Sequence, residues 1–414
     1  MQKKKGGDGI LQVTKAKIFI SASIVFLMLA LFTGIFRLMS VNSINTGILS
    51  SIYGLHPIIM VFGFLASIVM AERVVGISVF PELKDSKLLF SMVPLVAVGV
   101  VSEIFGYTES ESFVKYLGSS LLIAGCIVFV SVLIRLTRKS GIKMPFYYMI
   151  LSVVPLLGSA ALSSFELPAG EPAFIMLLLS FPMIFILGER VELSKFTSAR
   201  SSTKKFEAAF VLSILAVTLF SIASLLSSYR IQVDITSIGL FFLFATLLAV
   251  LSAEISNFKI LTKSIQPLQR YVSIHTRIAY GWAISGIIFA EIYFLSPLSF
   301  DFYDAFIHSL AVGFIGTMLL AHGPVILPSV TGRKLESSSI SIGPLLLLTI
   351  ANLIRIVGDI VLNIFYSYSV EVIVGLSGWL VLASVLFFLR EILSKSKLRK
   401  ENTVTVKRNP GLQI

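Results

Sequence analysis

Long apolar stretches and short polar connections alternate along almost the whole chain. Twelve apolar stretches are long enough to cross a bilayer as helices, because about 20 residues span its hydrocarbon core. We place them at 17–38, 55–72, 88–106, 116–135, 145–163, 172–188, 206–227, 234–253, 276–296, 303–328, 342–363 and 369–390. The pattern predicts an all-α integral membrane protein with about twelve transmembrane helices, and its first expected partner is the lipid bilayer.

The same pattern predicts the domain organisation. No soluble domain separates from the apolar stretches, so residues 17–390 are expected to form one transmembrane domain. A cytoplasmic N-terminal tail (1–16) and a basic cytoplasmic C-terminal tail (391–414) are expected to flank it. The composition agrees, because 56% of the 414 residues are hydrophobic and only 14% are charged. A soluble globular protein is excluded.

The net charge of +12 is distributed unevenly. Most of the 34 basic residues fall on alternate connections and at the two ends, whereas the intervening connections are short and acidic. Because basic loops remain in the cytoplasm, both termini are expected there, in a multi-pass protein of the plasma membrane. The positive charge is an orientation signal, and no nucleic-acid partner is expected.

The span 303–328 contains two of the chain's four histidines, His308 and His322. Fourteen residues separate them, which places both on one helical face, roughly 21 Å apart along the axis. An imidazole inside hydrocarbon needs a partner, and haem iron fits this arrangement best. Three glycines leave room on this helix for such a flat, wide group: Gly313, Gly316 and Gly323.

A third histidine, His56, lies at the start of the span 55–72. This span and the span 303–328 both run inward, so His56 and His308 are expected at one depth in the outer half of the membrane. We expect these two imidazoles to be the axial ligands of a haem b. The alternative is that each is a helix-end histidine satisfied by water or by a loop carbonyl.

The inner histidines, His275 and His322, are expected near the cytoplasmic surface. One interpretation is a second haem or metal site formed by the two. The other is that His275, which lies among basic, solvated residues, is an interfacial histidine with no ligand role.

The span 342–363 contains two charged residues, Arg355 and Asp359, four positions apart on one helical face. The simple interpretation is an ion pair within the helix. The functional interpretation is that Arg355 neutralises haem propionates, since the outward direction of this span brings it toward His56 and His308.

Several stretches resemble, in order and spacing, the signature sequences of the NnrS family. They are GLHPIIMVFGF, LGERVELSKFTSAR, AYGWAISG, HSLAVGFIGTM, TGRK and LLTIANLIRIVG. The resemblance implies a membrane protein of about twelve helices that binds haem and copper, with a bundle distantly similar to the catalytic subunit of haem-copper oxidases. It implies a role in nitric-oxide stress, with nitric oxide as a ligand and a redox protein or quinol as partner. His56, His308 and Arg355 match family positions.

Departures from the family pattern bear on the metals. The family usually has His-x-His-Glu in its second span, and here Ile58 and Ile59 replace the last two of these residues. Two further family histidines fall on Arg277 and Val330. These departures weaken the case for a copper site at those positions, and copper stays a second, less favoured metal beside haem. No histidine lies in 145–253, which excludes an ordinary terminal oxidase on ligand count.

Two other functions stay open. A twelve-helix secondary transporter has the same general plan, and Arg355 and Asp359 would then bind substrate. An assembly factor that holds haem in transit would carry the same ligands as a resident cytochrome. The single cysteine, Cys126, excludes disulfides, thiolate metal cages and covalent c-type haem attachment. Whether the protein catalyses a reaction does not follow from these residues.

Overall fold

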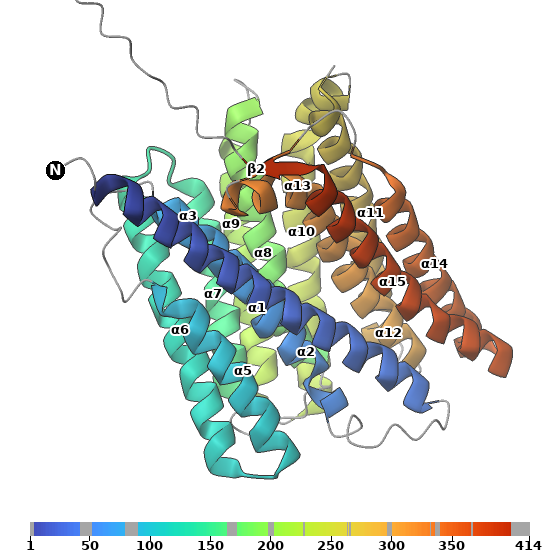
Figure 1. Ribbon diagram of the computed structural model, residues 1–414. Coiled ribbons are helices and arrows are strands. Elements are labelled where there is room, and N and C mark those ends of the chain that lie inside the picture. Colours follow the sequence, from blue (N-terminus) through green and yellow to red (C-terminus); the bar gives the residue numbers. More distant parts are fainter. Residues whose placement is uncertain are drawn as a thin grey trace, which may run out of the picture.

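The helices pack side by side in one bundle, with α1 crossing one face obliquely (Figure 1). The computed structural model describes residues 4–41, 52–78, 90–163, 172–197, 203–226, 228–262, 264, 266–295, 300–331, 333–335, 340–365 and 367–398. A helix pairs every backbone N–H and C=O within its own segment, so apolar sequence in hydrocarbon adopts this structure.

The helices of the described chain follow the predicted order closely. They are α1 (Lys4–Val41), α2 (His56–Ile58), α3 (Ser67–Ser78), α5 (Met92–Thr108), α6 (Ser112–Lys139), α7 (Met144–Ser163), α8 (Pro172–Thr197), α9 (Thr203–Ser224), α10 (Tyr229–Thr262), α11 (Pro267–Leu295), α12 (Phe300–His308), α13 (Thr317–Thr331), α14 (Gly343–Ile364) and α15 (Tyr368–Lys395).

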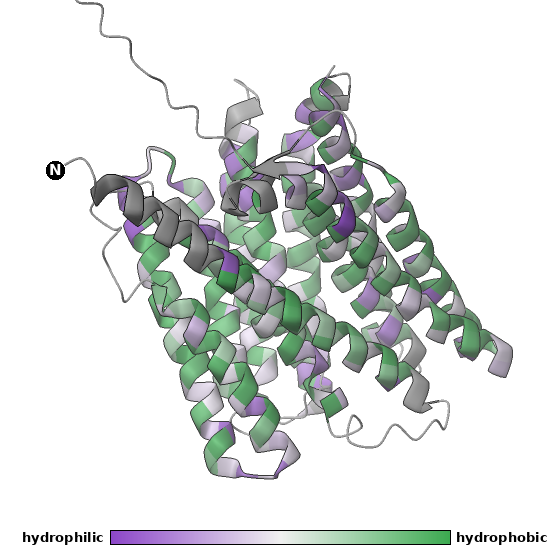
Figure 2. Ribbon diagram, viewed as in Figure 1, coloured by the Kyte–Doolittle hydropathy of each residue, from purple (hydrophilic) through white to green (hydrophobic). Residues whose placement is uncertain are grey.

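Eleven helical segments of the described chain are long and apolar enough to cross a membrane. A further helix, α5, is apolar but shorter. Apolar residues run along the lengths of the helices, and hydrophilic residues lie mostly toward their ends (Figure 2). The prediction of an all-α multi-pass membrane protein is confirmed, with eleven long helices and the shorter α5 at the twelve predicted positions.

Helix α8 lies at the centre of the bundle. Its most apolar window is 94% buried, whereas the corresponding windows of α9 and α10 are 39% buried. Helices adjacent in the sequence pack as pairs, for example α5 with α6, α9 with α10, and α14 with α15. Helix α1 packs on the segment 56–78 and also contacts α15, so the first and last spans meet.

Two of the spans contain π-helix in their middle. The segment η2 (Ile59–Ala66) joins α2 to α3, and η3 (Ser309–Gly316) joins α12 to α13. Eight residues is long for a conformation that is rare and mostly occurs as single turns, often at functional sites. Each π segment follows one of the two outer histidines, which the sequence pattern did not predict.

Parts of the predicted tails are ordered. Helix α1 begins at Lys4, within the predicted N-terminal tail, and α15 continues to Lys395. Two short strands, β1 (Arg333–Leu335) and β2 (Ser396–Leu398), pair antiparallel. The chain just after the last span is therefore fixed to the chain just after α13.

Candidate functional site

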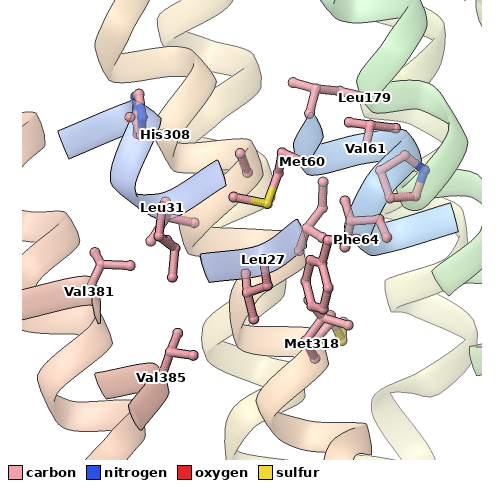
Figure 3. A pocket seen from close by; sticks show the side chains of 18 of the residues that line it. Leu27, Leu31, Met60, Val61, Phe64, Leu179, His308, Met318, Val381 and Val385 are labelled. Atoms are coloured by element: carbon pink, nitrogen blue, oxygen red, sulfur yellow. The ribbon is translucent and has the colours of Figure 1, made fainter. Parts of the chain in front are cut away.

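A cavity of about 320 Å³ lies between α1, the segment 56–72, α8, the segment 303–326 and α15. This volume is at the lower end of small-molecule sites. Most of its lining is aliphatic or aromatic, and Figure 3 shows Met60, Phe64 and Leu31 at its wall with His308 near them. Its charged and histidine lining residues fall into two groups, which we name the His308 end (Arg37, His56, Asp304, His308 and Arg355) and the His322 end (Glu72, Glu189 and His322).

At the His308 end, His56 is held by helix α1. Its Nδ1 lies 2.8 Å from the backbone oxygen of Ala30. A methyl group at Gly34 would lie 2.8 Å from Cε1 of His56, so the absence of a side chain at Gly34 makes room for the ring. Helix α1 thus fixes this imidazole by a hydrogen bond and by close packing.

The second histidine, His308, is held by its own helix and by α14. Its Nδ1 lies 2.9 Å from the backbone oxygen of Asp304 and 3.3 Å from that residue's carboxylate. The same carboxylate accepts two hydrogen bonds from Arg355, with Nε at 2.7 Å from Oδ2 and Nη2 at 3.1 Å from Oδ1. Asp304, which the sequence analysis missed, connects α14 to the imidazole.

Arg355 has a partner that the sequence did not predict. Its bidentate partner is Asp304 on α12, and the predicted partner Asp359 of its own helix also interacts with it electrostatically. Its charge is matched by that carboxylate, which weakens the predicted role as the cation for haem propionates. Arg355 lies at the expected end of the cavity, where it orients Asp304. The four-residue spacing of Asp304 and His308 was a readable signal for this contact.

The hydrogen bonds of the two outer histidines determine their tautomers. Among the described residues, both rings bond through Nδ1 to a backbone carbonyl, which can only accept. Each Nδ1 therefore carries the proton, and each Nε2 carries the lone pair. Histidines that ligate metals are typically oriented in this way. The rings line one cavity, and His308 is close enough to His56 to interact electrostatically with it.

The three glycines of the span 303–328 differ in the space that they leave beside the helix. A methyl group at Gly313 would lie 2.6 Å from Trp282, and one at Gly323 would lie 2.6 Å from Phe388, so these glycines allow helix packing. The expectation that Gly313 leaves space for a flat group is wrong, whereas Gly323 packs against Phe388 and also lines the cavity. Gly316 lines the cavity, and the nearest atoms to a methyl group there are at 3.6 Å, so this position fits the expectation.

At the His322 end, the cavity is lined by one histidine and two acidic residues. His322 is only 6% exposed, and its Nε2 has no hydrogen-bond partner among the described residues. Glu72 and Glu189 line the cavity with it. Arg73 lies behind them, 3.2 Å from Glu189 and 3.9 Å from Glu72, with its guanidinium 5.5 Å from the ring centre of Phe185.

His275 does not lie where the sequence analysis expected it. It is fully buried, with Nδ1 2.8 Å from the backbone oxygen of Tyr271 and its ring 3.7 Å from the Tyr271 ring. The expectation of solvated surroundings is wrong. His275 is not among the lining residues of the cavity that contains His322. The described residues also contain no group of three or more His, Cys, Asp or Glu that could hold a metal ion.

The cavity contains two nitrogen donors and an apolar wall, which are the features that a haem site requires. Haem iron needs two protein ligands, and His56 and His308, each with an anchored ring and a lone pair on Nε2, line this cavity. The wall between the two ends is apolar, with Met60 and Ile315 among its residues, and Gly316 adds no side chain to it.

Residues 17–396, which include every span of the bundle, match a family described as a domain of unknown function, DUF8744. No curated protein matches the chain. The chain belongs to the DUF8744 family.

Proposed function

We propose that this chain is a b-type haem protein of the plasma membrane, with His56 and His308 as axial ligands. The proposal rests on one observation, which is that the His56 and His308 rings are held by the same kind of hydrogen bond. Both rings bond to carbonyl oxygen through Nδ1 and line one cavity, which is how proteins prepare imidazoles for a metal. The resemblance of the HSLAVGFIGTM and TGRK stretches to the NnrS family supports the same function and suggests a role in nitric-oxide stress.

Different residues would hold and tune the two histidines of such a site. Ala30 and Gly34 hold the His56 ring, while Asp304 accepts from His308 and strengthens its basicity. A bound haem supplies one-electron transfer, and two imidazoles saturate the iron and favour electron transfer over ligand activation.

Two guanidiniums lie near the proposed iron site. Arg355 is bound by Asp304, and Arg37 lines the same end of the cavity. Arg37 is close enough to His56 to interact with it electrostatically. We expect Arg37, together with Arg355, to lie toward the haem propionates.

The test is the absorption spectrum of the purified protein with iron analysis. We expect a reduced Soret band that is lost in His56→Ala and in His308→Ala. The matched control is His275→Ala, because His275 is a buried histidine that does not line the cavity. A purified wild-type protein that stays colourless after haem is supplied would overturn the proposal, as would a band that survives both ligand substitutions.

A secondary transporter is the second candidate, and one observation favours it. The cavity has charged residues at both ends, from Arg37 to Glu72 and Glu189, as a path across the membrane requires. Solute uptake by vesicles that contain the colourless protein would support this function. The same experiment on His56→Ala separates the candidates, because transport does not need an imidazole pair as iron ligands.

A further inference from the structure

A buried carboxyl group lies where α5, α6 and α7 pack side by side (Figure 1). Glu103 on α5 is only 1% exposed, and no residue of these three helices lines the cavity described above. Five residues separate Glu103 from the end of α5, which is roughly 8 Å of helix. A carboxyl group at this depth in a membrane helix is unfavourable unless other groups satisfy it, so such a residue is a candidate functional site.

Two serine hydroxyls from the neighbouring helices bond to Glu103. Oγ of Ser119 on α6 lies 2.5 Å from Oε1 of Glu103, and Oγ of Ser163 at the end of α7 lies 3.4 Å from the same oxygen. The two hydroxyl oxygens are 3.1 Å apart. A methyl group at Gly118 would lie 3.0 Å from Cγ of Glu103, so the missing side chain there makes room for the acid. Three helices thus assemble one buried cluster of oxygen atoms.

Each of the two hydroxyls also has a second acceptor within reach. Oγ of Ser119 lies 3.3 Å from the backbone oxygen of Lys115, and Oγ of Ser163 lies 2.9 Å from that of Ala160. A hydroxyl group has a single hydrogen, so each serine donates either to Glu103 or to its backbone carbonyl. The hydrogen bonds of the cluster therefore have two arrangements on the same oxygen positions.

The two arrangements suit the two charge states of the acid. When Glu103 is a carboxylate, both serines donate to it, and the short 2.5 Å separation from Ser119 is typical of a hydrogen bond to a charged oxygen. When Glu103 is protonated, its O–H donates to Ser119, while Ser119 and Ser163 donate to their backbone carbonyls. The cluster thus satisfies Glu103 with or without the proton, by rotation of hydroxyl hydrogens alone.

The surroundings of the cluster favour a proton over a metal ion as its ligand. The oxygens already bond directly to one another, which leaves no space for an ion between them. The charged side chain that interacts electrostatically with Glu103 is Lys115 on α6, and its positive charge supports the carboxylate state. The sequence of α7 contains no charged residue, and the nearby tyrosines Tyr107 and Tyr116 are exposed.

We propose that Glu103 is a proton-binding site that exchanges its proton with water at the connection 109–111. On release, the O–H bond of the acid breaks, its electron pair stays on the carboxylate oxygen and the proton passes to a water molecule. Binding is the reverse of this step. The charge at the α5–α6–α7 junction then follows the pH on that side of the membrane. This site does not depend on a haem.

The test is pH-difference infrared spectroscopy of the full-length protein in detergent micelles, which follows the C=O stretch of a protonated carboxyl group. Between about pH 10 and about pH 4 we expect a titrating band that Glu103→Gln removes. Ser119→Ala is expected to raise the midpoint of this band by about one pH unit, because the carboxylate loses its shortest hydrogen bond. Ser120→Ala is the matched control, because Ser120 is exposed and bonds to the Tyr116 carbonyl, and it should leave the midpoint unchanged.

Three results would overturn the proposal. One is a difference spectrum of Glu103→Gln identical to that of the wild type, and another is an equal midpoint in the wild type, Ser119→Ala and Ser120→Ala. The third is a midpoint that falls when sodium chloride replaces choline chloride at equal concentration, which would assign the site to a sodium ion. A monodisperse gel-filtration peak shows that each variant has folded. Haem absorbance enters none of these outcomes, so this inference and the proposed function fail separately.

Discussion

At the scale of single residues, the Asp304 carboxylate connects His308 to Arg355 at the His308 end. It lies 2.7 Å from Arg355 and 3.3 Å from His308, and both charged side chains are less than 15% exposed. A buried pair of this kind contributes little net stability, but removal of one partner leaves an uncompensated charge. The three side chains therefore act as a unit that spans α12 and α14.

This unit predicts a non-additive pair of substitutions. Asp304→Ala leaves the Arg355 charge buried and is expected to lower the free energy of unfolding by about 3–5 kcal/mol. Asp304→Ala combined with Arg355→Met removes both charges and is expected to recover most of that loss. Thermal unfolding in micelles measures both. A double variant as unstable as the sum of the two single ones would show that the residues do not interact as described.

Single residues also show how far the sequence could predict the site. The common direction of their two spans predicted that His56 and His308 share one end of the bundle, and both line one cavity. The anchors were not predictable, because Ala30 contributes only a backbone oxygen and every residue has one. The burial of His275 was missed because its neighbours Arg270 and Arg277 suggested a solvated surface.

At the scale of elements, glycines decide how closely α7 and α8 approach. A methyl group at Gly188 would lie 2.9 Å from the backbone oxygen of Pro145, which cannot rotate away. At Gly158, in the same helix pair, the nearest atom would be Cδ2 of Leu177 at 3.4 Å, the end of a flexible side chain. Both positions are glycine, but a methyl group fits at Gly158 and meets fixed backbone at Gly188.

We expect these glycines to respond differently to the same substitution. Gly188→Ala should lower the free energy of unfolding by about 1–3 kcal/mol, because the core is overpacked against backbone. Gly158→Ala should leave stability nearly unchanged or raise it slightly, since alanine favours the helix. Thermal unfolding of the two variants is the measurement. Equal destabilisation by both would contradict the close contact at Gly188.

The apolar pattern predicted the spans well but not the π segments. The ranges predicted for α7 and α14 differ from the observed ones by a residue or two, because polar connections mark the helix ends clearly. The composition of η2 and η3 is ordinary for a membrane helix. In these segments Gly63 packs against Phe26 and Gly313 against Trp282, contacts between helices that no local pattern encodes.

At the scale of the whole molecule, the orientation of the chain depends on its shortest crossing. Helix α5 has 17 residues, roughly 25 Å of helix, whereas the hydrocarbon core is about 30 Å thick. Eleven crossings would leave the termini on opposite sides of the membrane, and twelve would return them to the same side. The uneven distribution of basic residues favours twelve.

Reporter fusions test this count. Green fluorescent protein fused after Ile414 is expected to fluoresce, and alkaline phosphatase inserted in the loop 109–111 is expected to be active, because basic segments stay in the cytoplasm. Phosphatase fused after Ile414 serves as the reciprocal control and is expected to be inactive. An active phosphatase at that end would show that α5 does not cross and that the predicted topology is wrong.

Helix α14 presents an exposed apolar surface on one side and contacts Asp304 on the other. Leu346, Ile350, Leu353 and Val357 are each about half exposed on its outer surface. From the same helix Arg355 reaches Asp304, and Asp304 reaches the imidazole. A change in bilayer thickness that tilts α14 would therefore shift the His308 ring, so that lipid composition influences the position of this imidazole.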